Sequence, residues 1–104
     1  MDIQPILDEL RRRFRDHYRT RLEKLVLFGS RARGDADPDS DIDVLVVLAG
    51  TVDGLTEIDD TIGIVADVSL KHDCVVTCVF VSNEEYRTRQ SPLMMNVRRE
   101  GISL

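Results

Sequence analysis

The segment from Ile42 to Leu48 constrains the fold more than any other part of the chain. It reads IDVLVVL, an apolar run broken only by Asp43, and it follows directly on an aspartate-rich loop. A run so continuous in apolar character is typical of a strand buried on both faces, and not of an edge strand. We therefore expect a sheet covered by helices, with this strand inside it.

The spacing of apolar residues predicts the remaining elements. Strands are expected over residues 24–28 and 74–81, and helices over residues 3–20, 55–71 and 92–99. Ser82 and Glu85 have the spacing of a capping box, which starts a short helix. This order predicts an α/β fold, with helices packed on a small mixed β-sheet. At 104 residues the chain fits a single domain, residues 1–104.

Two of these helices are expected to bury apolar residues in the core. They are Leu55, Ile58, Ile62, Val65 and Leu70 in the first, and Leu93, Met94, Met95 and Val97 in the last. Cys74 and Cys78 lie in an apolar run without a nearby histidine, so we interpret them as small buried side chains and not as a zinc site.

The composition excludes several functions. A net charge of −5, the absence of Trp and the few aromatic residues argue against direct DNA binding and against base stacking. A metal-bound nucleotide is not excluded, because the metal inverts the local charge. No apolar run reaches the roughly 20 residues of a membrane span, and the first residues do not resemble a signal peptide. We therefore expect a cytoplasmic protein without a membrane partner.

Asp41 and Asp43 indicate a metal site. Side chains alternate along a strand, so these two carboxylates share one face while Ile42 points to the other. Without a counter-charge they repel and raise each other's pKa. Mg²⁺ removes this repulsion, since it is commonly held by one or two carboxylates together with substrate phosphates. Turn chemistry accounts for the loop aspartates Asp35, Asp37 and Asp39.

The turn before this loop suits phosphate. Gly29 allows a phosphate to approach the backbone closely, and Ser30 is expected to cap a helical turn whose free N–H groups favour an anion. Arg31 and Arg33 add positive charge near a triphosphate. The ligand that fits both the turn and the acid pair is a nucleoside triphosphate.

The string GSRARGDADPDSDID resembles the signature of the minimal nucleotidyltransferases of the DNA polymerase β superfamily: Gly-Ser, ten residues, then Asp-x-Asp. The resemblance implies a polymerase-β-like nucleotidyltransferase fold. It also implies that ATP or another NTP donates a nucleotide to an acceptor hydroxyl by a two-metal mechanism, with two Mg²⁺ or Mn²⁺ ions. Asp41 and Asp43 would hold the metals and be the catalytic residues. Gly29, Ser30, Arg31 and Arg33 would bind the phosphates.

Members of this family usually carry a third carboxylate on the next strand. Here the expected position falls at about Val79, with Thr77 and Val81 on the same face, and none of the three is acidic. Asp73 lies six residues earlier and would serve only if the strand were bent or displaced in register. The resemblance therefore leaves three alternatives open: activity with two carboxylates, a group supplied by a partner, or nucleotide binding without turnover.

The resemblance also implies a partner. Minimal nucleotidyltransferases of this kind often pair with a small helical HEPN protein in toxin–antitoxin modules, where AMP is transferred to a tyrosine of the toxin. The alternative is a regulatory subunit that binds nucleotide and acts by contact. The base preference and the oligomeric state stay open.

A basic cluster on the first helix allows two interpretations. It is either a solvated face, partly paired with nearby acids, or a surface for an acidic partner or acceptor phosphates. Its residues are Arg11, Arg12, Arg13, Arg15 and Arg19.

Overall fold

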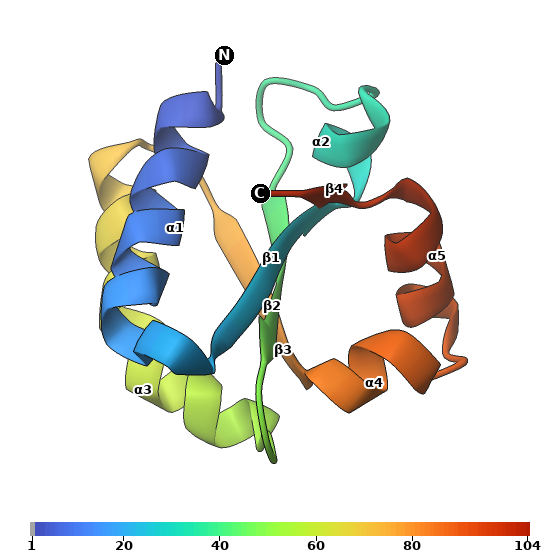
Figure 1. Cartoon of the computed structure of the whole chain (residues 1–104). Helices are drawn as coiled ribbons and strands as arrows, with labels where there is room; N and C mark the ends of the chain where they lie inside the picture. Colours follow the sequence, from blue (N-terminus) through green and yellow to red (C-terminus); the bar gives the residue numbers. More distant parts are fainter. Residues whose placement is uncertain (1) are drawn as a thin grey trace.

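The computed structural model describes residues 2–104 and has the predicted α/β architecture (Figure 1). The elements are α1 (Gln4–Tyr18), the 3₁₀ turn η1 (Arg19–Arg21), β1 (Leu22–Phe28), α2 (Ser30–Arg33), β2 (Ile42–Leu48), α3 (Gly54–Lys71), β3 (Val76–Ser82), α4 (Asn83–Thr88), α5 (Pro92–Glu100) and β4 (Ile102–Ser103). No described helix has both the length and the apolar character needed to cross a membrane.

The sheet is mixed and has four strands in the order β3-β2-β1-β4. β1 pairs antiparallel with β2 and with β4, whereas β2 pairs parallel with β3. A parallel pair needs a crossover connection, and α3 provides it. The small mixed sheet expected from the sequence is therefore confirmed.

Helices cover both faces of the sheet (Figure 1). One core lies between the sheet and α1 with α3, and it includes Phe14, Val44 and Val68; the other lies towards α4 and α5, and it includes Leu45 and Met94. Every residue of β2 is buried except Asp43, which is half-buried. This two-sided burial explains why the strand reads as a nearly unbroken apolar run.

Most predicted elements are confirmed with small shifts. β2 and the start of α5 lie where predicted, and the capping box of Ser82 and Glu85 is present at α4. β1 begins two residues earlier than expected, and β3 runs over Val76–Ser82 instead of residues 74–81. The two-residue β4 was not predicted. In α5, Met94 and Val97 are buried, but Leu93 and Met95 are exposed, so only half of the predicted core face is correct.

The predicted core face of α3 is largely wrong. Leu55 and Leu70 are 80% and 83% exposed, and Ile58 and Ile62 are also exposed. The helix instead turns Glu57, Thr61 and Val68 inward.

Hydrogen bonds with residues of other elements stabilise this orientation of α3. Glu57 accepts hydrogen bonds from the Tyr18 hydroxyl and from Arg21, both at 2.9 Å, and Thr61 donates to the Glu57 carbonyl at 2.7 Å. Buried polar groups with such partners do not carry the full penalty of desolvation. The cysteines are free and half-buried, and burial raises the pKa of the Cys78 thiol to about 12, which keeps it protonated.

Candidate active site

Gly29 ends β1 in a conformation that suits only glycine. Its φ of 73° and ψ of −157° lie in a region that L side chains rarely adopt. A Cβ at this position would lie 2.4 Å from Oδ2 of Asp43 on the neighbouring strand, where Phe28 pairs with Asp43. The glycine therefore leaves the space that the Asp43 carboxylate occupies.

Asp41 and Asp43 lie together at the entrance to β2. Ile42 between them is fully buried in the core under α1 and α3, so the two acids lie on the other side of the chain. The pKa of Asp43 is raised, first by burial and then by the charge of Asp41, while Arg33 opposes the shift. Neither carboxylate forms an ion pair with another described residue. The repulsion expected between the two carboxylates therefore contributes to the raised pKa of Asp43.

Ser30 does not cap the helical turn, contrary to the expectation. Gly29 occupies the N-cap position without a side-chain hydrogen bond, and Ser30 is the first residue of α2. The Gly29 carbonyl accepts from the amides of Ala32 and Arg33, both at 3.1 Å. The Ser30 hydroxyl is consequently not committed to closing this turn.

Arg31 and Arg33 mainly hold the polypeptide around the site. Arg31 Nη2 donates to the carbonyls of Pro38 and Ser40, both at 3.1 Å, while its Nε is buried without a partner. These bonds fix the loop that leads into Asp41. Arg33 pairs with Asp35 at 3.2 Å and with Glu100 at 3.5 Å, and these acids raise its pKa. Both arginines thus shape the loop, a role that the sequence analysis did not assign to them.

The neighbour of Asp43 on β3 is Thr77. The parallel register pairs Asp43 with Thr77 and Leu45 with Val79, so the position expected at Val79 lies two residues too far along the strand. Asp73 lies before β3 in a turn with a φ of 50°. Within residues 2–104, no three Asp, Glu, His or Cys side chains are grouped so that they could hold a metal ion. Asp73 therefore does not complete a three-ligand group with Asp41 and Asp43.

The acid pair has the donor chemistry that Mg²⁺ prefers. Its oxygens are hard ligands that form no ion pair within the described residues, and the pKa of Asp43 is raised, first by burial and then by the charge of Asp41. The donor set fits a divalent cation that completes its shell with phosphate and water oxygens.

The chain belongs to the nucleotidyltransferase domain family, whose model matches residues 7–94. Two proteins of Methanocaldococcus jannaschii are similar over almost the full length. "Putative protein adenylyltransferase MJ0604" is 33% identical over 102 residues (97% of this chain, 96% of the relative), and "Putative protein adenylyltransferase MJ0141" is 36% identical over 104 residues (100% of both).

Solved structures share the fold. A toxin–antitoxin structure with AMP-PNP matches with a TM-score of 0.63 at 22% identity, covering 90% of this chain and 68% of that one. The complex of a tri-AMPylated Shewanella oneidensis HEPN toxin with its MNT antitoxin matches with a TM-score of 0.56 at 19% identity, covering 94% and 70%. The protein is thus a member of the nucleotidyltransferase domain family, and its fold is similar to that of the antitoxins in these toxin–antitoxin structures.

Proposed function

We propose that this protein transfers AMP from ATP to a hydroxyl group of a partner protein, and that the partner is a small helical HEPN toxin. The pair Asp41 and Asp43, which forms no ion pair with a described residue and lies beside the Gly29 turn, is the observation that carries this proposal. The relatives named as protein adenylyltransferases and the similar structures with AMP-PNP and with an AMPylated HEPN toxin support the choice of nucleotide and acceptor.

In this proposal Asp41 and Asp43 hold divalent metal, most simply Mg²⁺, in up to two sites. When bound, the metal would neutralise the acids, polarise the phosphates and help to deprotonate the acceptor hydroxyl. Gly29 keeps the backbone clear for the triphosphate, and the Ser30 hydroxyl donates to one of its oxygens. Arg31 holds the loop so that Asp41 keeps its place beside Asp43. The acceptor oxygen then bonds to the α-phosphorus while the bond from that phosphorus to the α,β-bridging oxygen breaks, so that pyrophosphate leaves and the hydroxyl proton is released to water.

The test is transfer of label from ATP carrying ³²P in the α-phosphate. We expect the label to move to the protein encoded beside this one, in the presence of Mg²⁺, and to be lost with Asp41→Asn and with Asp43→Asn. Asp39→Asn is the matched control, because Asp39 is an exposed aspartate of the same loop. Binding of Mn²⁺, followed by its electron paramagnetic resonance signal, should fall in the same two variants. Label transfer that survives both variants would contradict the proposal.

A second function is favoured by one observation, namely that the residue paired with Asp43 on β3 is Thr77, so that strand supplies no third carboxylate beside the pair. A site with two carboxylates would hold nucleotide but turn it over slowly, and the protein would then regulate its partner by binding it. Saturable binding of ATP and Mg²⁺ without label on the partner would identify this function. Thr77→Asp should increase transfer if the acid is what the site lacks.

A further inference from the structure

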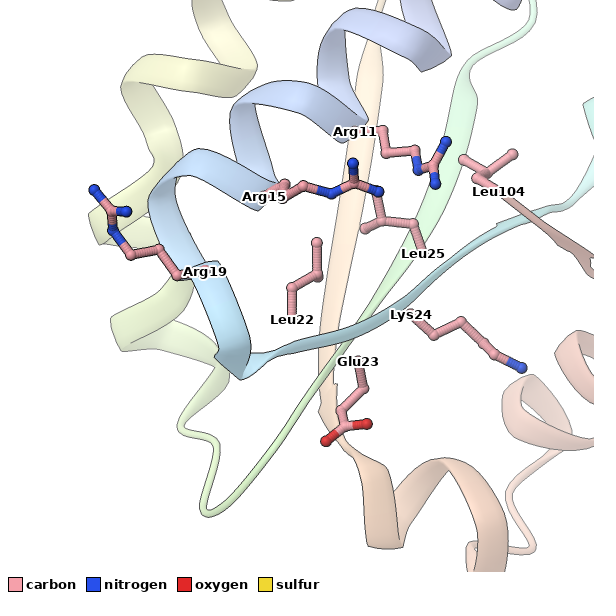
Figure 2. Close-up of a pocket in the computed structure, with 8 residues that line it drawn as sticks. All are labelled: Arg11, Arg15, Arg19, Leu22, Glu23, Lys24, Leu25 and Leu104. Atoms are coloured by element: carbon pink, nitrogen blue, oxygen red, sulfur yellow. The ribbon is translucent and has the colours of Figure 1, made fainter.

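Arg11 and Arg15 of α1 line a groove that lies away from the candidate active site. The groove has a volume of about 150 Å³, and its floor is formed by Leu22 and Leu25 of β1 together with Leu104. In Figure 2 both guanidinium groups extend from α1 over the sheet towards Leu104. We call this site, defined by these five residues, the arginine groove.

The two arginines have no partner within the described chain. Among the arginines of α1, Arg13 forms ion pairs with Glu9 and Asp67, whereas Arg11 and Arg15 form neither an ion pair nor a side-chain hydrogen bond with residues 2–104. Arg19, Glu23 and Lys24 also border the groove, but Figure 2 shows that their side chains point away from the two guanidinium groups. Two neighbouring positive charges are therefore left over a partly apolar floor, in a protein whose net charge is −5.

The edge of β1 beside the groove is open. β4 pairs only with Val26 and Leu27, and the amide of Leu104 adds one bond to the Leu25 carbonyl. Before Leu25, β1 has no strand on this edge among the described residues, so its outward backbone groups are available to another strand. A segment that continued the line of β4 would pair with Leu22–Lys24.

The dimensions of the groove favour an extended peptide. Arg11 and Arg15 are one helical turn apart, or about 6 Å along the axis, and alternate side chains on a strand are about 6.8 Å apart. The acidic side chains of an added strand would therefore meet both arginines. Its opposite face would meet Lys24, which lies over the Tyr86 ring at 5.3 Å. The groove is also smaller than the roughly 300 Å³ at which pockets for small ligands begin.

We propose that the arginine groove binds an extended acidic segment of a partner protein, which adds a strand to the open edge of β1. Charge complementarity selects the acidic segment, and the open backbone edge selects a polypeptide. A nucleic acid is disfavoured because no aromatic side chain lines the groove for stacking. The proposal goes beyond the proposed transfer reaction and does not depend on it.

The experiment measures the binding of a fluorescein-labelled peptide of alternating Glu and Thr to the full chain at low ionic strength. We expect saturable binding that weakens with added salt. The variant with Arg11→Glu and Arg15→Glu should bind at least about tenfold more weakly, because two attractive pairs become repulsive. Arg12→Glu is the matched control, an exposed arginine of the same helix that does not line the groove, and it should change the affinity by no more than about twofold.

A second measurement tests strand addition. Amide hydrogen exchange of residues 22–24 should slow when the acidic peptide binds, while the peptide with Lys in place of Glu should leave it unchanged. Three results would overturn the proposal: no saturable binding of the acidic peptide, an equal loss in the Arg12→Glu control, or preferential binding of single-stranded RNA of the same length. Circular dichroism and thermal unfolding serve as the check that the variants fold.

Discussion

Gly29 and Asp43 stand on paired strands, and each restricts what the other position can hold. The carboxylate occupies the space of a missing Cβ, and the backbone of Gly29 lies in a region open mainly to glycine. Gly34 has a positive φ of 83° as well, but no atom lies within 4 Å of a Cβ placed there. A comparison of substitutions at the two glycines therefore distinguishes the effect of backbone strain from that of the close contact with Asp43.

We expect Gly29→Ala to lower stability by about 1–3 kcal/mol and to abolish Mn²⁺ binding, because the new methyl group displaces the Asp43 carboxylate. Gly34→Ala should lower stability by about 1 kcal/mol, a few degrees in melting temperature, and keep the metal site. Thermal unfolding and Mn²⁺ titration measure the two effects. Equal loss of metal binding in both variants would show that loop strain, and not the contact with Asp43, governs the site.

Asp43 should also affect the pH dependence of stability. Its pKa in the folded protein is raised above 3.8, so the folded state holds this proton more tightly than the unfolded state does. The contribution of Asp43 to stability therefore falls as pH rises through and above 3.8. In metal-free buffer we expect Asp43→Asn to melt at a higher temperature than the wild type at pH 7, and the difference to vanish near pH 3. Asp39→Asn provides the comparison, and a lower melting temperature of Asp43→Asn at pH 7 would refute this account.

At the scale of elements, polar contacts decide how the helices sit on the sheet. Glu9 of α1 contacts His72 at 3.0 Å and Lys71 at 3.1 Å at the end of α3. The inward turn of α3 depends likewise on Tyr18 and Arg21, which satisfy Glu57. These contacts join residues that are 36 to 63 positions apart.

Hydrogen bonds from His72 and Lys71 lower the pKa of Glu9 to about 2, from a usual 4.5. Glu9 therefore adds stability above pH 4.5, and this contribution is lost as pH falls towards 2. We expect Glu9→Gln to be less stable than the wild type at pH 7 and equally stable at pH 2, as measured by urea unfolding. Asp8→Asn is the control, since Asp8 is exposed and, among residues 2–104, its side chain bonds only Gln4 of its own helix. A difference that persists unchanged at pH 2 would assign the effect to packing.

The sequence analysis predicted the features that depend on residues close together in the chain. The run Ile42–Leu48, the capping box and the start of α5 were all predictable because their signals are local. The face of α3 was not, since the residues that satisfy Glu57 are distant in sequence. β4 was missed because a two-residue strand has no periodicity, and its pairing with Val26 and Leu27 is long-range. At the candidate site the motif located the acid pair, but the carbonyl partners of Arg31 depend on the path of the loop.

At the scale of the whole molecule, one sheet carries two cores. Leu27 belongs to the core under α1 and α3, and Leu45 belongs to the core under α4 and α5, on strands that are directly paired. Both layers of helices pack on the same sheet. The two layers should therefore unfold together.

We expect Leu27→Ala and Leu45→Ala each to lower the free energy of unfolding by about 2–5 kcal/mol, within one cooperative transition. Tyr18 lies in the first core and Tyr86 packs against the second, and the chain has no other tyrosine and no tryptophan. Tyrosine fluorescence of Tyr86→Phe and of Tyr18→Phe therefore reports each layer separately. Within each variant its urea midpoint should equal that of circular dichroism, and a divergence would mean that the layers unfold independently.

Because two negative charges lie close together at the start of β2, the melting temperature of the protein should report whether a cation is bound there. A cation that settles between Asp41 and Asp43 relieves their repulsion only while the chain is folded, so it shifts the unfolding equilibrium by mass action. A simple melting curve can then rank metals and nucleotides without any knowledge of the acceptor. The melting temperature should therefore be highest when the divalent cation and the nucleoside triphosphate are both bound.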